Sequence, residues 1–510
     1  MKIIFRADAS LQIGTGHVMR CLTLAEELKN KGAEVGFICR DLPGNLTSFI
    51  RSKKYDVYLL PAVNESSDSS GENKSKYSEW LGVSSECDAA ETRSKLLSIG
   101  CVDWLIVDHY ALDEDWEMIQ RDAVGNIFVI DDLADRAHDC NLLLDQNFYA
   151  EMEDRYVNLI PAECKQLLGP KYTLLRKEFR DVRSQMQKRQ SEVSRIFIFF
   201  GGVDATNMTS KVLDVITNIE LDAINFDVVI GSANPHREYI ERLCLKNKNI
   251  TLHIQVNNMA QLMSEADLCI GSGGTVTWER CCLGLPAMAF SVAENQKLLL
   301  QDSAKAGLVY APDVDAPSSD EIRYHLKALL QNPYLRELIG QTGLNTIDGR
   351  GAVRLANILI KPEIELRQAA LSDMEKIYTW RNDVSVRRYS HSQAEIDFAQ
   401  HQLWFEKIIK DSDKPVLIAS IQDEDLGVVR FDINDRQAEV SIYLLADMQE
   451  KGFGLVLLSA GEKWLIKYRQ NIENITAEIL PENTASRKLF ELSGYRANSI
   501  CYQKSLKSCL

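Results

Sequence analysis

A histidine follows two glycines shortly after the first apolar run of the chain, in the order Gly14, Thr15, Gly16 and His17. The glycines permit a tight turn, and the amphipathic stretch 18–29 predicts a helix directly behind it. The free amides and partial positive charge of a helix start disfavour a protonated imidazole and can hold an anion or orient a water. We therefore expect His17 to act as a neutral general base. The alternative is a simple turn with His17 as a helix cap, because short glycine motifs often match by chance.

A second glycine-rich turn lies within EADLCIGSGGTVTWERCCLGLP, residues 265–286, which indicate a buried strand, a turn and a helix. The amides of such a turn can hold a diphosphate without a metal ion. Glu279, about one turn into the helix, can accept hydrogen bonds from ribose hydroxyls, and two polar residues follow the next strand. The expected ligands in this region are Gly271, Ser272, Gly273, Gly274, Glu279, Asn295 and Gln296. The alternative is a plain loop in which Glu279 is a solvated helix charge.

A third glycine pattern, QEKGFG at 449–454, fits Q-x-x-G-x-G and stands between an alternating apolar strand and a predicted helix. Its glycines permit the turn, and its amides can cradle the pyrophosphate of acetyl-CoA. Together with ENTASRKLFELSGY at 482–495, the pattern is typical of GNAT acetyltransferases. The expected cofactor ligands are Gln449, Lys451, Gly452, Phe453, Gly454 and Asn483.

The acid–base groups of this third region leave alternatives open. Glu439, on the strand before the glycine pattern, is a candidate base acting through water on a protonated amine; the alternative is an exposed strand charge. Many GNAT enzymes carry a tyrosine general acid where this chain has Phe490. Tyr495 and Tyr502 are candidate replacements, and the sequence does not choose between them.

The elements that must position these residues are two α/β lobes and a third, smaller unit. Short apolar runs alternate with helical stretches over the first 350 residues, which predicts parallel sheets covered by helices. The expected strands are 2–5, 34–39, 104–107, 126–130 and 142–144, then a run from Arg195 (IFIFFGG), and 226–230, 250–256, 267–270 and 287–290. Glycine-rich turns after strands in both lobes predict a GT-B arrangement with the substrate between the lobes. We expect lobes at 1–175 and 176–361 and an acetyltransferase domain at 362–510.

Composition limits the classes of protein that fit. A formal net charge of −15 over 510 residues argues against a general nucleic-acid-binding surface. The twelve cysteines show no zinc-type spacing, so we expect reduced thiols and no metal. The chain shows no signal-peptide pattern and no membrane-span-length apolar run, which indicates a cytoplasmic protein with no obligate protein partner evident. The polar stretch between residues 63 and 92 predicts a mobile loop or lid.

The first 350 residues resemble the UDP-2,4-diacetamido-2,4,6-trideoxy-β-L-altropyranose hydrolases of pseudaminic acid biosynthesis. The matching segments are RADASLQIGTGHVMRCLTLAEEL at 6–28, VDHY at 107–110, IDDLADR at 130–136, LLGPKYTLLRKEF at 167–179 and FFGGVDATN at 199–207. The resemblance implies that His17 is the general base and that UDP leaves while water attacks the anomeric carbon with inversion. It also implies substrate contacts from Asp8, Gly14, Gly16, Arg20, Gly201 and Gly202. Asp8 is expected to orient His17 or a sugar hydroxyl, unless it only caps the turn.

The third unit resembles the acetyltransferases that modify the 4-amino group of UDP-4-amino-4,6-dideoxy-N-acetyl-β-L-altrosamine. The product of that reaction is the substrate of the hydrolase, so the resemblance implies a bifunctional enzyme whose substrates are a UDP-sugar and acetyl-CoA. The main alternative is a GT-B glycosyltransferase fused to a protein N-acetyltransferase, because the glycine-rich turn also resembles that of glycosyltransferases using UDP-N-acetylglucosamine. A catalytically silent nucleotide-sugar-binding module is the third hypothesis.

Overall fold

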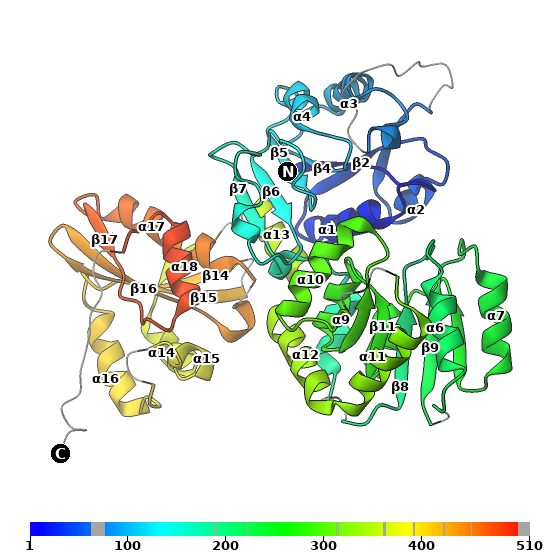
Figure 1. Ribbon diagram of the computed structural model, residues 1–510. Coiled ribbons are helices and arrows are strands. Elements are labelled where there is room, and N and C mark those ends of the chain that lie inside the picture. The colour runs from blue at the N-terminus through cyan, green and yellow to red at the C-terminus, as the bar shows by residue number, and fades with distance from the viewer. Residues whose placement is uncertain are drawn as a thin grey trace. The chain divides into compact units, whose positions relative to one another are not determined.

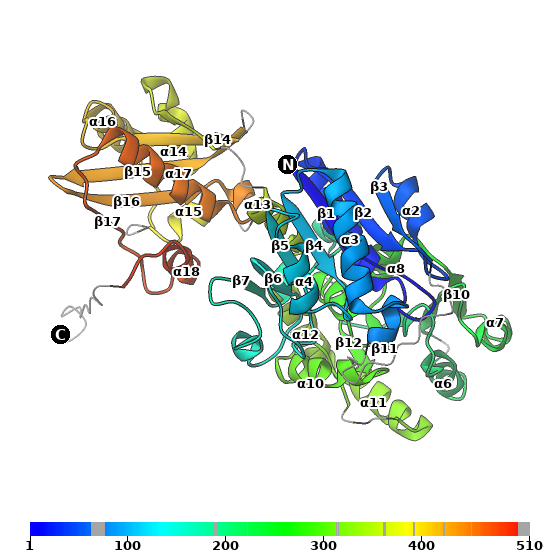
Figure 2. The same cartoon turned by 90° about the horizontal axis from the view of Figure 1, so that it is seen from above.

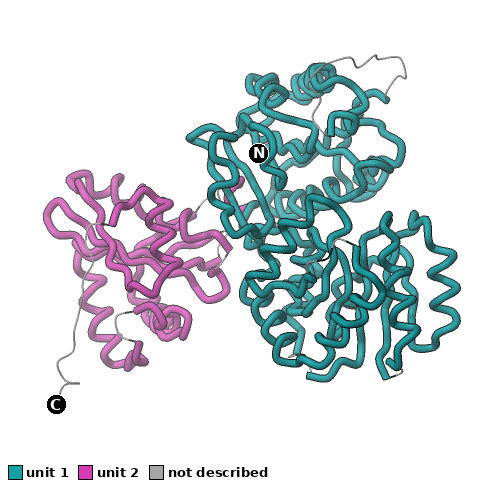
Figure 3. Tube along the Cα trace, viewed as in Figure 1, with its two compact units in different colours: residues 1–356 teal, residues 357–510 magenta. Residues whose placement is uncertain are grey.

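The chain divides into two compact units, residues 1–356 and 357–510 (Figures 1 and 3). The computed structural model describes residues 1–62, 77–187, 189, 191–221, 223–312, 314, 316–360, 364–390, 393–421, 424–449 and 451–497. The first unit contains two parallel sheets with helices on their faces, and the second contains one mixed sheet. The structure thus has two α/β lobes followed by a separate α/β unit, which agrees with the layers expected from the sequence.

The first lobe is built on a seven-stranded parallel sheet of order β3-β2-β1-β4-β5-β6-β7. Its strands are β1 (Lys2–Ala7), β2 (Glu34–Arg40), β3 (Asp56–Leu60), β4 (Trp104–Asp108), β5 (Asn126–Ile130), β6 (Leu142–Asp145) and β7 (Lys165–Leu168). Its helices are α1 (Gly16–Asn30), α2 (Thr47–Ser52), η1 (Ser78–Leu81), α3 (Ser85–Ile99), α4 (Glu114–Gln120), η2 (Met152–Asp154) and η3 (Pro170–Tyr172). Helices α3 and α4 cover one face of the sheet, where their apolar side chains pack on those of β1, β2 and β4 (Figure 2).

The second lobe has a five-stranded parallel sheet of order β10-β9-β8-β11-β12. Its strands are β8 (Arg195–Phe199), β9 (Asn225–Ile230), β10 (Ile250–Ile254), β11 (Leu268–Ser272) and β12 (Ala287–Phe290). The helices are α5 (Lys177–Gln185), α6 (Met208–Ile216), α7 (Arg237–Lys246), α8 (Met259–Glu265), α9 (Val276–Cys282), η4 (Glu294–Gln296), α10 (Lys297–Lys305), α11 (Ser319–Gln331), α12 (Pro333–Thr346) and α13 (Gly351–Leu359). Every strand expected from the apolar runs of this lobe is present.

The backbone passes between the two lobes twice. On the outward passage, Arg183 of α5 donates hydrogen bonds to the carbonyls of Cys282, Leu344 and Ile347 in the second lobe. On the return, Gly351 at the start of α13 lies so close to the Thr173 carbonyl that a Cβ would overlap it. Arg354 then donates to the Lys171 carbonyl at 2.8 Å. The outward passage is therefore held to the second lobe and the return passage to the first.

The second unit has a five-stranded sheet of order β13-β14-β15-β16-β17, antiparallel except for the parallel pair β16 and β17. Its strands are β13 (Glu365–Gln368), β14 (Val416–Ile421), β15 (Glu424–Asn434), β16 (Gln437–Leu444) and β17 (Asn474–Thr476). Its helices are η5 (Leu371–Asp373), α14 (Met374–Arg381), α15 (Val384–Arg387), α16 (Phe398–Ile408), η6 (Ala446–Met448), α17 (Phe453–Tyr468) and α18 (Thr484–Leu492). Separate apolar clusters lie under α17 on one face and under α14 and α16 on the other.

The polar stretch expected to be a loop or lid between residues 63 and 92 is helical where it is described. Residues 63–76 lie outside the described part of the chain. Residues 77–92 hold η1 and the first half of α3, so the expectation of a loop is wrong there. The reason is Asp88, a polar residue on α3 that is completely buried because two arginines of the sheet reach it.

Asp88 joins α3 to the sheet through its carboxylate. Arg6 Nη2 and Arg40 Nη2 each donate to Asp88 Oδ2 at 2.7 Å, and Trp116 Nε1 donates to Oδ1 at 3.0 Å. Burial alone raises the pKa of Asp88, but the charges of Arg6 and Arg40 outweigh it and hold the pKa well below its ordinary value. The helix is thus attached by ionic hydrogen bonds that water does not reach.

We predict that Asp88→Asn destabilises the first unit by about 3–5 kcal/mol, because it removes the buried carboxylate that Arg6 and Arg40 share and leaves each guanidinium with one remaining counter-charge, Asp8 or Glu91. Urea unfolding followed by circular dichroism measures the loss. Asp122→Asn is the matched control, since Asp122 pairs with Arg93 at the surface with 71% of its side chain exposed, and about 1 kcal/mol or less is expected. Equal losses in the two variants contradict the prediction. In the wild type this stabilisation is present above about pH 4 and is lost as the pH falls through the lowered pKa of Asp88.

Candidate functional site

His17 lies at the point where the strand order of the first sheet reverses. The chain leaves β1 for β2 on one side, whereas β4 lies on the other side of β1. Ligands of open parallel sheets bind beyond the carboxyl ends of the strands at such a reversal. Gly14 takes a positive φ of 80°, and α1 begins at Gly16, so the turn sets His17 in the first helical turn beside the end of β4.

Asp108, the last residue of β4, holds His17 in one orientation. The two atoms His17 Nδ1 and Asp108 Oδ1 are 2.6 Å apart, and the carboxylate is fully buried. Burial raises the pKa of Asp108, but the charge of Arg20 and the hydrogen bonds from Arg20 and His17 outweigh it and keep that pKa well below its ordinary value. Because an ionised carboxylate only accepts hydrogen bonds, Nδ1 carries the proton and Nε2 is left as the acceptor of the ring.

Arg20 fixes Asp108 in turn. Its Nε donates to Asp108 Oδ2 and its Nη2 to Oδ1, both at 2.6 Å, which is a bidentate pair. Arg20 Nη1 also donates to Asp132 Oδ2 at 3.2 Å. The guanidinium is therefore shared by two carboxylates and is 8% exposed. The resemblance implies a substrate contact for Arg20. In the structure its guanidinium binds Asp108, the carboxylate that orients His17.

Aromatic rings surround the imidazole. Tyr110 meets His17 edge-on with ring centroids 4.6 Å apart, and Trp80 of η1 does so at 6.1 Å while stacking on Tyr110 at 5.7 Å. The Tyr110 hydroxyl donates to Asp132 Oδ1 at 2.5 Å, and burial raises its pKa well above the ordinary value. The rings pack against the imidazole, and His17 is buried. The sequence did not indicate Trp80 as a site residue, because it lies within the polar stretch between residues 63 and 92.

Asp8 does not orient His17, contrary to the expectation. Its carboxylate is completely buried, pairs with Arg6 Nη1 at 2.8 Å and accepts from the backbone N–H of Arg40 at 2.7 Å. Asp8 therefore stabilises the loop beyond β1 and β2, and its burial also contradicts a direct substrate contact in this conformation. The sequence could have indicated Asp108 as a site residue, because it ends a buried strand, just as Asp8 directly follows one.

The glycine residues of the second lobe lie at the corresponding reversal of its sheet, between β8 and β11. Gly201 has a φ of 97°, and the Gly202 carbonyl accepts from the N–H of Gly231 at 2.9 Å. A Cβ on Gly271 would overlap the carbonyl of Phe199, so the close approach of β11 and β8 requires glycine there. The predicted turns after β8 and β11 are thus brought to one edge of the sheet.

The turn Gly271–Gly274 leads directly into α9. Gly274 has a φ of 87°, and a Cβ on it would stand 3.6 Å from Gln296 Nε2, so these two predicted ligands are neighbours. Asn295 is exposed in η4, next to Gln296. Arg280 donates to the Ser272 carbonyl at 2.9 Å from behind and stiffens the turn.

Glu279 is neither a solvated helix charge nor fully free for a ligand. Its side chain is 15% exposed and pairs with Arg176 Nη2 at 3.4 Å. Burial raises its pKa against the attraction of Arg176. A carboxylate held this way can exchange the single long Arg176 contact for hydrogen bonds from vicinal hydroxyls.

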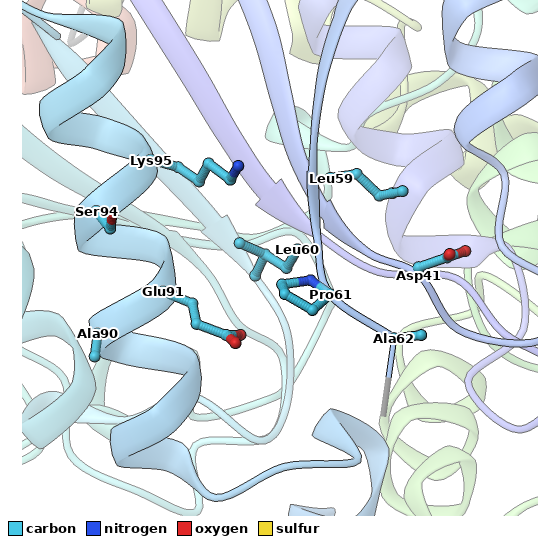
Figure 4. Close-up of a pocket in the computed structure, with 9 residues that line it drawn as sticks. All are labelled: Asp41, Leu59, Leu60, Pro61, Ala62, Ala90, Glu91, Ser94 and Lys95. Atoms are coloured by element: carbon cyan, nitrogen blue, oxygen red, sulfur yellow. The ribbon is translucent and has the colours of Figure 1, made fainter. Parts of the chain in front are cut away.

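The first lobe contains a pocket of about 500 Å³ (Figure 4). Its lining includes Leu60 and Pro61 from the end of β3 and Glu91 and Lys95 from α3. None of the predicted site residues lines it. Glu91 accepts a hydrogen bond from Arg40 at 2.6 Å, so its carboxylate already belongs to the buried charge cluster around Asp88.

The sheet of the second unit opens beside the predicted cofactor residues. Strand β16 pairs with β17 only through Gln437, Ala438 and Glu439, although β16 continues to Leu444. Gly452 takes a φ of 81° as the N-cap of α17, the helix that follows β16 and η6 in the chain. Gly454 and Phe453 form the first turn of α17, and Gly454 lies against Leu489 of α18.

Two predicted cofactor residues use their side chains inside the protein. Gln449 Nε2 donates to Ser385 Oγ at 2.9 Å and to the Leu444 carbonyl at 3.1 Å, and thereby fixes the loop. Asn483 caps α18 by accepting from the N–H of Ser486 at 3.0 Å. Lys451 follows, with its Nζ 3.9 Å from Met448 Sδ. The side chains of Gln449 and Asn483 thus shape the loop and the start of α18, and the contacts of these residues with the cofactor remain predictions.

The acid–base candidates of the second unit lie on different faces. Glu439 is exposed at the last position of β16 that pairs with β17, and it faces Asp432 of β15. Phe490 is buried in the core, Tyr495 donates to Glu462 at 2.8 Å, and Tyr502 lies outside the described residues. Sequence reasoning missed Tyr443, whose buried hydroxyl has no hydrogen-bond partner among the residues that the structure describes. Burial raises its pKa, so the hydroxyl keeps its proton.

Metal ligands and membrane spans were also sought in the described part of the chain. It holds no group of three or more His, Cys, Asp or Glu side chains suited to a metal ion. None of its helices is long and apolar enough to cross a membrane. The ten cysteines described there are free thiols, and eight of them are buried.

Comparisons with known proteins relate each part of the chain to a relative. Residues 363–496 match the family model described as an acetyltransferase (GNAT) domain. The UDP-2,4-diacetamido-2,4,6-trideoxy-beta-L-altropyranose hydrolase of Campylobacter jejuni is 28% identical over 308 residues, which are 60% of this chain and 97% of that protein. Acetyltransferase PseH of the same strain is 23% identical over 120 residues, 23% of this chain and 74% of that protein.

A solved structure supports the two-lobed fold. Acinetobacter baumannii MurG matches with a TM-score of 0.50 and 14% identity, covering 71% of this chain and 99% of that one. At this identity the likeness concerns the fold alone. The chain is thus a fusion of a UDP-sugar-hydrolase homologue of GT-B fold with an acetyltransferase domain of the GNAT family.

Proposed function

We propose that this chain catalyses two consecutive steps of pseudaminic acid synthesis. The second unit acetylates the 4-amino group of a UDP-4-amino-4,6-dideoxy-N-acetyl-altrosamine, and the first unit hydrolyses the resulting UDP-2,4-diacetamido-2,4,6-trideoxy-β-L-altropyranose. The hydrolase named for this substrate and an acetyltransferase are separate proteins in one strain of C. jejuni, and the two parts of this chain match them. Fusion keeps the intermediate near its next site where the geometry permits transfer.

The observation that carries the hydrolase proposal is the 2.6 Å contact between His17 Nδ1 and buried Asp108. It leaves Nε2 as a base for one proton of a water molecule. The water oxygen forms a bond to the anomeric carbon as the bond from that carbon to the UDP oxygen breaks, so UDP keeps its oxygen and the anomeric centre inverts. The amides at Gly274 and at the start of α9 are the proposed donors that stabilise the charge developing on the diphosphate, because Gly271 and Ser272 end β11 and the Gly273 N–H donates to the Phe290 carbonyl. A strong general acid is not required, because UDP is a good leaving group.

In the acetyltransferase step, the amine attacks the thioester carbon of acetyl-CoA. A C–N bond forms, the C–S bond breaks, and one amine proton is removed, with Glu439 as the proposed base through water. Tyr443 or Tyr495 is the candidate donor to the departing thiolate. Backbone amides at Gly452, Phe453 and Gly454 are the proposed cradle of the cofactor pyrophosphate.

A glycosyltransferase is the second candidate function, because the glycine-rich segment that leads into α9 also resembles that of glycosyltransferases using UDP-N-acetylglucosamine. In that case an acceptor alcohol replaces the water. Incubation of the full chain with the 4-amino UDP-sugar and acetyl-CoA, followed by mass spectrometry, separates the two. We expect an acetylated UDP-sugar and then free sugar with UDP. Release of UDP only after an acceptor alcohol is added would support the glycosyltransferase and contradict the hydrolase.

His17→Ala is expected to reduce UDP release by about 10²–10⁴-fold, because the water loses its base, while the acetylated intermediate still forms at the wild-type rate. Chromatography of both products from one reaction measures the two steps together. His325→Ala, which changes a histidine on α11 bonded to Tyr310, is the control and should leave both rates unchanged. If UDP release survives in His17→Ala, the assignment of the base is wrong.

Asp108→Asn is expected to lower kcat for UDP release by about 10²–10⁴-fold at pH 7, since an amide can present its N–H to Nδ1 and move the ring proton to Nε2. The pH–rate profile distinguishes this from a loss of folding, because a wrong tautomer changes the profile of the folded enzyme, whereas destabilisation alone lowers the thermal transition and leaves that profile unchanged. A variant with an unchanged profile and rate shows that Asp108 does not orient the base.

Gly452→Ala is expected to raise KM for acetyl-CoA about tenfold or more, because alanine at a φ of 81° costs about 1–2 kcal/mol and displaces the amides of the loop. Gly494→Ala is the matched control: it also has a positive φ, 87°, but lies after α18 with open space around its Cβ position. Isothermal titration with CoA measures binding directly. Equal effects of the two substitutions would refute a specific role for the loop.

A further inference from the structure

A chain of hydrogen bonds runs from the nucleotide-side helix α9 in the second lobe to the histidine site in the first. We propose that Asn147 and Asp132 are positioning residues that couple Trp278, on α9, to the orientation of His17. The inference rests on the proposed hydrolase function and deepens it. Through this chain, binding of the diphosphate in the second lobe would fix the orientation of His17 in the first.

Asp132 is the centre of this chain on the histidine side. Its Oδ1 accepts from Tyr110 at 2.5 Å, and its Oδ2 accepts from Arg20 Nη1 at 3.2 Å. Tyr110 packs edge-on against His17, and Arg20 holds the carboxylate that orients it. A shift of Asp132 therefore reaches the imidazole by two routes, one through packing and one through charge.

Asn147 connects Asp132 to the second lobe. Its Nδ2 donates to Asp132 Oδ2 at 3.2 Å, and its Oδ1 accepts from Trp278 Nε1 at 2.9 Å. An indole only donates and an ionised carboxylate only accepts, so one orientation of the amide satisfies both neighbours. Asn147 is 8% exposed and Trp278 is fully buried, so water does not readily replace either bond.

Trp278 is rigidly joined to the glycine-rich turn. Its backbone N–H donates to the Thr275 carbonyl at 3.0 Å, within the first turn of α9. Arg280 of the same helix binds the Ser272 carbonyl at 2.9 Å and Thr277 Oγ1 at 3.0 Å. A diphosphate on the turn amides therefore acts on the same rigid piece that carries the indole.

Other contacts between the lobes do not enter this chain. Arg180 of α5 pairs with Glu27 of α1 at 3.2 Å, and the N–H of Ala150 donates to Asp302 at 3.0 Å. Neither pair touches Asp132, Arg20 or Tyr110. They supply matched controls, because they join the same two bodies without reaching His17.

The test is a double-mutant cycle on UDP release by the full chain, with Trp278→Phe and Asp132→Asn. These two residues do not touch each other, so independent effects on kcat should multiply. We expect Trp278→Phe to lower kcat about 5- to 30-fold with KM changed less than about threefold. In the double variant we expect kcat within about twofold of Asp132→Asn alone. Multiplying effects overturn the proposal.

Glu27→Gln is the control partner in a second cycle with Asp132→Asn. We expect the single variant Glu27→Gln to have the kcat of the wild type. The double variant with Asp132→Asn should have the kcat of Asp132→Asn alone. Acetylation by the second unit of the same chain reports correct folding and concentration in every variant. A loss of kcat in Glu27→Gln as large as in Trp278→Phe would show that any break between the lobes acts alike, which also overturns the proposal.

A readout without turnover separates the inference from the proposed function. The Cε1–H resonance of His17, identified by its absence in His17→Gln, is followed during titration with UDP. We expect it to move in the wild type and in Glu27→Gln, and to move little in Trp278→Phe. If the resonance moves but the diacetamido UDP-sugar is not hydrolysed, only the proposed function is contradicted. If the resonance moves equally in Trp278→Phe, only the coupling is contradicted. Failure to bind UDP contradicts both.

Discussion

The buried carboxylate of Asp108 is the constraint on which the first unit depends. It ends a central strand, is removed from water, and accepts four close hydrogen bonds or contacts from His17, Arg20 and Cys21. An unpaired charge there would be costly, so the geometry of its partners is enforced by the folding energy itself. A sheet residue, and not a flexible loop, therefore determines which ring nitrogen of His17 carries the proton.

The same architectural rule places the glycine turns of the second lobe. Both sheets reverse their strand order next to their first strand, and in each the chain after that strand carries glycine. In the first lobe this edge carries a side chain that can take a proton. In the second it carries backbone amides, and the close approach of β8 and β11 excludes any Cβ at Gly271. One lobe is therefore suited to acid–base chemistry and the other to holding an anion.

Much of the fold could be predicted from the sequence, because central strands are continuous apolar runs. Strands β3 and β7 were missed because they are edge strands with half-exposed residues, as in KQLL. The site was harder, since the choice between Asp8 and Asp108 depends on which strand neighbours β1, and Ala7 pairs with Asp108 only through the sheet register. Trp80 was hidden by the polar residues before it, and the cap role of Asn483 competes with ligand binding for the same oxygen.

The two passages of the backbone between the lobes limit how those lobes can move. A body attached at one point is free to turn about three axes, whereas a body attached at two points turns only about the line that joins them. Here one attachment is made at Arg183 and the other at Gly351 and Arg354. The two passages therefore favour a rotation about the line that joins them as the opening motion of the first unit, in which the contacts Asn147–Trp278, Arg180–Glu27 and Ala150–Asp302 would have to break. Sliding or twisting of one lobe across the other would require these attachments to break.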